Sequence, residues 1–512
     1  MRILVIGLMV FTLVTAVAVS QVATGTINVE VQDSTGAVVP GATVDLTHVS
    51  TSQARQGKTN DAGQFRATFL PVGEYTISAE AAGFKRKTMT GLVLRVDQNT
   101  TITAVLVPGE VREIVEVAAT APLLEASTSS VGQVIDTRQI QDMPLSGRNP
   151  FALGLLSGNT VPMTGQSTNL PFVGGGGRFT STEVMLDGVD NNAAASGGAI
   201  GRSGVAYTPS VDAVQEFKVQ TNNFSAEFGQ AAGVVMNATI RAGTNAFHGT
   251  AFEFLRNDKL DATNFFTNAV GLKKGMYRQN QFGGAMGGRI IRNRTFFFGD
   301  YQGTRRSTQS GSAISNLPPA AYRAGDFSLL SATIYDPAAR RIGPSGVVIS
   351  TPYVGNRIPA SQVNPTSAAI MGLIPMPNYG APNAESRNFF IALPRHNRDD
   401  RGDVRIDHTI SSSNNLYGRF SMANAPNVAV GSFGAGQWIG GGSTSLDNSR
   451  QLALSDVHVF SPTTVNEFRF GYVRSNSSNV GTAPQGVAFA QQNKLALFPF
   501  PELGFPSFNF YY

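Results

Sequence analysis

The stretch that decides the fold is residues 280–306, NQFGGAMGGRIIRNRTFFFGDYQGTRR. Apolar and polar residues alternate on both sides of a short polar turn, which predicts a β-hairpin. One row of its first strand is apolar, comprising Phe282, Gly284, Met286, Gly288 and Ile290. The facing row is small or polar, comprising Gln279, Gln281, Gly283, Ala285, Gly287 and Arg289. The apolar row must therefore meet either a protein core or lipid.

The same alternation recurs farther along, in residues 416–422 and 467–472. Strands of about ten residues, apolar on the outside, polar on the inside and joined by turns, are typical of a transmembrane β-barrel. The aromatic run Phe296-Phe297-Phe298 suits the girdle of such a barrel. We therefore expect the apolar row to face lipid and the glycines of the facing row to leave space for a domain packed inside.

Composition agrees with a β-rich protein and excludes several classes of site. Only 14% of the 512 residues are charged and 55 are glycine, whereas soluble proteins average about 25% charged residues. The 39 Lys and Arg residues are scattered, so no nucleic-acid partner is expected. The absence of cysteine excludes disulfides, thiolate metal sites and cysteine nucleophiles.

The N-terminus has the pattern of a secretory signal peptide, assigned to residues 1–20. Arg2 precedes an apolar run that ends in Ala16-Val17-Ala18, and polar residues follow at once. A membrane anchor is the alternative, but the run is at or below the roughly 17–25 residues that a spanning helix needs. We find no later apolar run of that length, which leaves soluble export or a β-barrel.

Residues 23–108 alternate in short strands separated by turns, which predicts a β-sandwich. The patterns VQDSTGAVVPGATVDL and TNDAGQFRATFLPVGEYTISAEAAGFK resemble the carboxypeptidase regulatory-like domain, a transthyretin-like sandwich. A zinc carboxypeptidase would need a His-x-x-Glu ligand pair, and none of the five histidines has glutamate three residues later. We therefore expect no enzymatic activity, no metal and no cofactor.

The polar run RHNRDDRGD, residues 395–403, raises two further possibilities. His396 precedes Asp399 by three residues, and Arg401-Gly402-Asp403 matches the tripeptide of integrin ligands. Since alternating residues begin at Val404, the simplest interpretation is a solvated loop that ends in a turn at the start of a strand.

Four motifs follow in a distinctive order: MPLSGRN at residues 143–149, LDGVDNN at 186–192, FSAEFG at 224–229 and FHGTAFEFLRNDKLDATNFF at 247–266. In this order they closely resemble the TonB-dependent outer-membrane receptors of the Oar-like type. The resemblance implies a mainly β chain with an N-terminal β-sandwich, an α+β plug domain and the first part of an antiparallel transmembrane β-barrel.

The resemblance also implies a domain order and a location. The expected segments are the signal peptide 1–20, the sandwich 23–108, a linker 109–122, the plug 123–243 and a partial barrel with extracellular loops 244–512. The protein is expected in the outer membrane of a Gram-negative cell, with the sandwich in the periplasm. Implied partners are the TonB energy-transducing protein, outer-membrane lipid and an unidentified extracellular ligand. The plug-motif residues are Pro144, Gly147, Arg148, Asn149, Asp187, Gly188, Asp190 and Asn191.

By the same resemblance the linker lies where such receptors carry the TonB box. The candidate residues are Glu113, Ile114, Val115, Glu116 and Val117. A TonB box binds by β-augmentation, in which an extended segment adds a strand to its partner. The alternative is that the same residues form the last strand of the sandwich, and the sequence leaves both interpretations open.

Asp187, Asp190 and the two asparagines after it are oxygen donors that suit calcium. An EF-hand loop, however, ends in a bidentate glutamate at position 12, which is absent here, so a turn between plug strands is expected. The proline-rich residues 307–395 are expected to be extracellular loops that contact ligand.

Strand number suggests a fragment. Plugged outer-membrane transporters have about 22 strands, whereas the residues after Asn245 would supply about ten or twelve strands at ~10 residues each. Phe508, Phe510 and Tyr512 alternate as a last barrel strand would, but the strand count makes a missing C-terminal part the simpler expectation. The expected function is import of a bulky nutrient such as a carbohydrate oligomer or peptide. The alternatives are an Oar-like surface receptor or adhesion protein, or a carbohydrate-binding protein, without transport.

Overall fold

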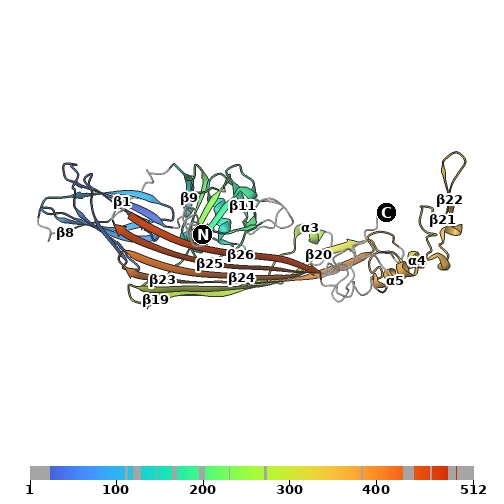
Figure 1. Cartoon of the computed structure of the whole chain (residues 1–512). Coiled ribbons are helices and arrows are strands. Elements are labelled where there is room, and N and C mark those ends of the chain that lie inside the picture. Colours follow the sequence, from blue (N-terminus) through green and yellow to red (C-terminus); the bar gives the residue numbers. More distant parts are fainter. Residues whose placement is uncertain are drawn as a thin grey trace, which may run out of the picture.

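We describe the protein from a computed structural model. The structure describes residues 24–109, 114–118, 129–145, 147–163, 170–194, 202–229, 231–269, 274–381, 384–429, 443–461, 464–481 and 492. The predicted signal peptide, Glu113 of the TonB-box candidate and the alternation at residues 508–512 lie outside these ranges. Figure 1 shows a sandwich at one end of a long sheet, a plug against one face of that sheet, and a small lobe beyond its other end.

The sandwich consists of a three-stranded sheet, β4-β1-β7, packed on a five-stranded sheet, β3-β2-β5-β6-β8. Alternate residues of β1 are buried, as period-two patterning requires for a strand with one face on a core. The core contains Val29, Leu46 and Ile77. The strands are β1 (Gly25–Asp33), β2 (Thr43–His48), β3 (Ala54–Lys58), β4 (Gln64–Leu70), β5 (Gly73–Glu80), β6 (Arg86–Leu94), β7 (Asn99–Leu106) and β8 (Ile114–Ala118).

The eighth strand answers one question that the sequence left open. β8 contains four of the five TonB-box candidate residues and pairs in parallel with β6, from Arg86 opposite Ile114 to Thr90 opposite Ala118. The segment is therefore a strand of the sandwich, beyond the expected boundary at residue 108. Binding of a partner at the same strand stays a prediction.

The plug is built on a five-stranded sheet, β13-β12-β17-β16-β9. Phe151, Phe172 and Phe217 are fully buried in its core. The elements are β9 (Val131–Ile135), α2 (Thr137–Asp142), η1 (Pro150–Leu156), β10 (Thr160–Pro162), β11 (Phe172–Gly174), η2 (Phe179–Ser181), β12 (Glu183–Leu186), β13 (Val189–Asp190), β14 (Asn192–Ala194), β15 (Arg202–Val205), β16 (Val214–Asn222) and β17 (Val235–Ile240).

The long sheet has seven antiparallel strands in the order β18-β19-β20-β23-β24-β25-β26. They are β18 (His248–Asn257), β19 (Tyr277–Ile291), β20 (Thr295–Ser315), β23 (Phe389–Ser411), β24 (Asn414–Ala429), β25 (Ser443–Ser461) and β26 (Thr464–Gly481), with α3 (Phe265–Ala269) between the first two. The expected hairpin of residues 280–306 is confirmed as β19 paired with β20. Several of these strands are longer than the expected length of about ten residues, since β20 and β23 have 21 and 23 residues.

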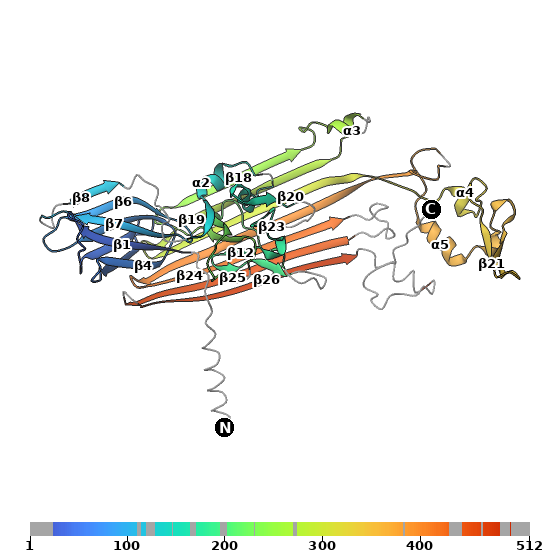
Figure 2. The same ribbon diagram turned by 90° about the horizontal axis from the view of Figure 1, so that it is seen from above.

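The two faces of this sheet differ as the alternation predicted. The plug packs against one face, which we call the plug face (Figure 2). The opposite, outer face carries exposed apolar side chains from every strand, namely Leu255, Met286, Ile290, Tyr301, Val404, Ile406, Ile410, Leu416, Phe420, Met422, Leu454, Phe468, Phe470 and Tyr472. A continuous apolar surface of this size on a sheet is expected to contact hydrocarbon.

Glycines on the plug face do not all serve the expected purpose. A Cβ on Gly471 would lie 2.5 Å from Val189 Cγ1 of the plug, so this glycine does let the plug approach. A Cβ on Gly283 would instead meet the ring of Phe252 on the neighbouring strand. Space at Gly283 is therefore filled from within the sheet and not by the plug.

The interpretation of residues 395–403 as a solvated loop and turn was wrong. They lie inside β23, where Asp400 and Asp403 are buried. Arg401 donates to Thr208 O of the plug at 2.8 Å, whereas Asp400 pairs with Arg305 of the neighbouring strand β20. The run is polar because its side chains pair with the plug or with the next strand.

Only part of residues 307–395 is loop. β20 runs to Ser315 and β23 starts at Phe389, and the residues between them fold into a lobe around Leu317, Ile374 and Phe389. Its elements are α4 (Ala320–Arg323), β21 (Tyr335–Ile342), β22 (Val348–Pro352), η3 (Val354–Asn356), η4 (Ala360–Gln362) and α5 (Pro365–Leu373). Within the described ranges, no helix has both the length and the apolar character needed to cross a membrane.

The outer face makes a direct prediction. Val404→Arg places a charge on the apolar surface and should destabilise the folded state in lipid vesicles by about 2–4 kcal/mol if Val404 lies near the bilayer midplane. The measurement is urea-induced unfolding in vesicles. Val348→Arg in the lobe is the matched control, since Val348 is 45% exposed and Val404 56%; an equal effect of the two substitutions would contradict a lipid-facing surface.

Candidate functional site

The candidate site is the interface between the plug and the plug face of the sheet, and its centre is the turn between β12 and β13. Leu186 pairs with Val189, so Asp187 and Gly188 form a two-residue turn. Both have positive φ, 51° and 72°, as the tight turns of hairpins require. The Asp187 carboxylate accepts a hydrogen bond from Ile240 N at 3.0 Å. The expected turn is thus confirmed, and it holds a buried carboxylate at the plug surface.

Two arginines of the sheet hold this carboxylate. Asp187 Oδ2 is 2.6 Å from Arg419 Nε, and Asp187 Oδ1 is 3.4 Å from Arg405 Nη1. Arg419 also donates to Leu186 O at 3.3 Å, and Arg405 donates to Ile240 O at 2.9 Å. Tyr417 donates to Asp187 O at 3.2 Å. Because Asp187 and Arg419 are each 1% exposed, this ion pair is almost completely removed from water.

A second group of contacts joins the plug segment 207–210 to two aspartates on neighbouring strands. Asp300 of β20 lies directly opposite Asp403 of β23. Tyr207 donates to Asp403 Oδ2 and Ser210 to Asp300 Oδ2, both at 2.6 Å. Burial, together with the nearby Asp403 and Asp300, raises the pKa of Tyr207 well above its usual value. The phenol therefore stays protonated and acts as a donor to the sheet.

The third group of contacts starts from Arg148 in the motif MPLSGRN. Its guanidinium lies 2.5 Å from Asp212 Oδ2 of the plug and stacks 4.0 and 4.8 Å from the ring centres of Phe252 and Phe254 on β18. Arg148 has φ of 51°, an unfavourable conformation for a residue with a Cβ. Such strain persists only where surrounding contacts hold the backbone in place. Here the contacts of the Arg148 side chain with Phe252 and Phe254 hold the motif against the sheet.

The other plug-motif residues divide into two sets. Gln281 of β19 donates to Gly147 O at 3.3 Å. Asn191 bonds both N and O of Tyr207 and accepts from Gln451 of β25. Asn149 caps η1 by accepting from Phe151 N. Pro144 and Asp190 are exposed. The Asp190 carboxylate accepts a hydrogen bond from Asn192 N at 2.9 Å.

Sequence reasoning missed the sheet side of this interface. Arg419 was predicted only as a polar residue of an alternating strand, Arg405 was not singled out, and Asp403 was placed in a turn. Their odd residue numbers could have indicated them. In the paired register of β23 and β24, odd-numbered residues such as Arg405, Arg419 and Tyr417 point to the same face of the sheet. Their partners on the plug lie at least 165 residues away in the sequence, and no local pattern specifies those.

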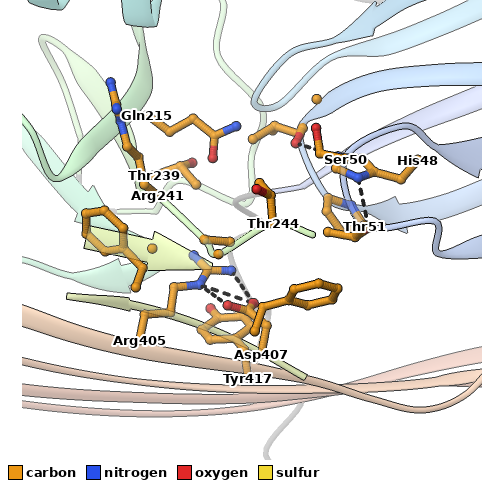
Figure 3. Close-up of a pocket in the computed structure, with 18 of the residues that line it drawn as sticks. His48, Ser50, Thr51, Gln215, Thr239, Arg241, Thr244, Arg405, Asp407 and Tyr417 are labelled. Carbon is orange, nitrogen blue, oxygen red and sulfur yellow. Dashed lines mark hydrogen bonds and ion pairs between the residues drawn. The ribbon is translucent and has the colours of Figure 1, made fainter. Parts of the chain in front are cut away.

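A cavity of about 560 Å³ lies where sandwich, plug and sheet meet. Figure 3 shows His48, Ser50 and Thr51 of the sandwich on one side of it, with Arg405, Asp407 and Tyr417 of the sheet on the other. Thr239 and Arg241 of the plug complete the wall. Among the described residues, no group of three or more His, Asp or Glu side chains is arranged to hold a metal ion.

The contacts that join the plug to the sheet are largely ionic and polar. Buried ion pairs are weak contributors to net stability, because desolvation of the charges offsets much of their attraction. Water hydrates these charged and polar side chains readily when they are exposed, whereas exposed apolar side chains are not hydrated favourably. Apolar contacts accompany the polar ones, because Phe298 of β20 is part of the plug core and Ala285 and Ala423 of the sheet pack against it.

The comparisons with known proteins agree with this architecture. The sequence profile of the outer membrane beta barrel domain matches residues 239–512, and that of the carboxypeptidase regulatory-like domain matches residues 26–107. The first match covers more than half of the chain, so the protein belongs to the outer membrane beta barrel family and is located in the outer membrane. Its fold class is mainly β, as expected.

The chain is also homologous to the TonB-dependent transporter Oar of Myxococcus xanthus. The two are 26% identical over 272 residues, which are 51% of this chain and 25% of that protein. The chain thus spans about a quarter of the length of this relative.

Solved structures with similarity include the outer membrane transporter YddB from Escherichia coli, with a TM-score of 0.41, 11% identity and coverage of 71% of this chain and 40% of that one. Another is the siderophore receptor PirA from Acinetobacter baumannii, with a TM-score of 0.33, 14% identity and coverage of 70% and 46%.

The buried ion pair gives a prediction. Arg419→Met leaves Asp187 buried without its main partner and should weaken attachment of the plug by about 3–5 kcal/mol. The measurement is hydrogen exchange of the β12 and β17 amides, which should become faster. Adding Asp187→Asn should recover part of the protection, because the uncompensated charge is removed.

The control is the same substitution at an exposed site of the same sheet. The Arg398 side chain is 62% exposed and pairs with Asp400, so Arg398→Met should change plug stability by no more than about 0.5 kcal/mol. If Arg419→Met and Arg398→Met gave the same exchange rates, the ion pair would not hold the plug.

Proposed function

We propose that the protein is a TonB-dependent receptor that binds a bulky nutrient outside the cell and admits it when the plug is remodelled from the periplasm. The observation that carries this proposal is the buried ionic attachment of the plug through Asp187 and Arg419. A plug that must leave and return needs contacts that are specific but exchangeable with water. The protein performs no chemistry of its own in this proposal.

The ligand would be met at the lobe and neighbouring loops. The lobe is internally braced, since Arg323 donates to the carbonyl oxygens of Pro318, Met371, Ile374 and Pro375. Exposed apolar residues on it include Ile342 and Val354, at 76% and 94% exposure. A rigid lobe with exposed apolar side chains suits recognition of a large ligand. It also supports the second candidate, a surface receptor that binds without import.

The energising partner would bind at β8. In the sheet order β3-β2-β5-β6-β8 this strand is at the edge, and within the described residues its outer edge pairs with no other strand. An unpaired edge is the surface that β-augmentation uses. The TonB protein of the periplasm is the partner proposed for it.

Two proline substitutions test this partner. In a strand, successive N–H groups point to opposite edges, so Val115→Pro and Glu116→Pro remove donors from opposite sides of β8. One of them should weaken binding of the purified periplasmic domain of TonB, measured by calorimetry, without lowering the melting temperature of the sandwich. The other should mainly destabilise the pairing with β6.

Val115→Thr is the control, because threonine keeps strand propensity and the N–H group; its TonB binding should equal that of the wild type. Unchanged TonB binding in both proline variants would place the box elsewhere. If the proline variant that weakens TonB binding lost import of the ligand but still bound it at the cell surface, the protein would be a transporter and not only a surface receptor.

A further inference from the structure

The sandwich grips the plug through the turn between β6 and β7. Val96 N donates to the Glu216 carboxylate of β16, and Arg95 Nη1 is 3.4 Å from Glu216 Oε2. Lys218 Nζ donates to Asp97 O at 3.0 Å. Gln220 donates to the Asp97 carboxylate. We call these contacts of residues 95–97 with Glu216, Lys218 and Gln220 the sandwich–plug clamp.

The clamp engages the plug at a structurally secure place. Its three residues on β16 alternate along one face of the strand and are 5%, 3% and 1% exposed, in chain order. Strand β16 is held on both edges, by β17 and β9. A load on this face is therefore carried by the interior of the plug sheet and not by a loop.

The attachment of the sandwich on the side of the long sheet is smaller. Asn245 N donates to Ser50 O at 3.0 Å, and Asn245 belongs to the connection that follows the plug. Toward the wall of the sheet, the sandwich loop around His48 and Thr51 faces the 560 Å³ cavity. The described contacts thus join the sandwich more firmly to the plug than to the sheet.

The clamp also lies next in sequence to β6, the strand that pairs with the TonB-box candidate strand β8. β8 pairs with β6 over five residue pairs, and β6 ends at Leu94, immediately before the clamp residue Arg95. A pull on β8 therefore reaches β16 through β6 and the clamp, in addition to the covalent chain.

We propose that the sandwich moves with the plug as one body and transmits force from β8 to plug strand β16. The inference rests on the proposed function for the source of that force. It assigns the regulatory-like sandwich the role of a mechanical adaptor between the periplasmic partner and the plug.

The chemistry of Glu216 supplies a matched pair of variants. Burial raises the pKa of Glu216, opposed by the hydrogen bond from Val96 N and by Arg95. An uncharged acceptor should therefore serve almost as well as the carboxylate, so Glu216→Gln keeps the clamp. Glu216→Ala combined with Lys218→Ala removes three of its four contacts.

Spin-label distances in the full chain, reconstituted in lipid vesicles, test the proposal. Because the chain has no cysteine, single cysteines at exposed Glu74, Arg138 and Arg292 label the sandwich, plug and sheet, two at a time. In the wild type all three distances should be narrowly distributed. With Arg419→Met loosening the plug, the plug–sheet and sandwich–sheet distances should lose their single narrow peak together, while the sandwich–plug distance keeps it.

The clamp variants supply the second measurement. Glu216→Ala with Lys218→Ala, with Arg419 intact, should broaden the sandwich–plug distance, and Glu216→Gln should leave it narrow. A narrow sandwich–plug distance in the double alanine variant would overturn the proposal. So would a sandwich–sheet distance that stays narrow while the sandwich–plug distance broadens in Arg419→Met. Neither TonB nor ligand is present, so failure of the transport proposal would not affect this result.

Discussion

The constraint on which the structure depends is that a strand in a membrane must satisfy its backbone hydrogen bonds within a sheet while its two faces meet different environments. Where they lie beside the plug, the long strands therefore carry an outer row and a plug-facing row of different character. One row is apolar, as in Val404 and Phe420, and its neighbours are free to be polar, as in Asp403 and Arg419. Because the plug face is not in contact with hydrocarbon, it can carry charges that would be costly on the part of the outer face that meets hydrocarbon.

Those charges determine how the plug is held. The contacts of Asp187, Tyr207 and Arg148 are distributed over strands from β18 to β24, so no single strand carries the attachment. Two of these residues, Asp187 and Arg148, have left-handed backbone conformations. Strained backbone next to buried charge is characteristic of functional sites, where fold stability is not the only requirement. The attachment is specific in geometry and modest in net energy, which suits a part that must move.

The sandwich changes the mechanical picture of the molecule. It does not hang from the chain as a separate module, because its β6–β7 turn is fixed to a buried face of the plug and its edge strand is β8. Contacts therefore run without a break from β8, the candidate partner-binding strand, through the sandwich to plug strand β16. This continuity defines the residues at which coupling between β8 and the plug can be measured.

The amino-acid sequence by itself determined the two-faced strands, the hairpin of residues 280–306, the sandwich and the order of the plug motifs. These follow from period-two patterning and turn residues, which are local. Only the tertiary structure decided that residues 395–403 line an interface, that β8 belongs to the sandwich, and that Asp187 meets Arg419. Such pairings depend on strand register and on the approach of segments that are not neighbours in the sequence, as with Asp187 and Arg419, 232 residues apart. A polar residue in an alternating strand can face water, a loop or a buried partner, and its neighbours in sequence do not distinguish among these.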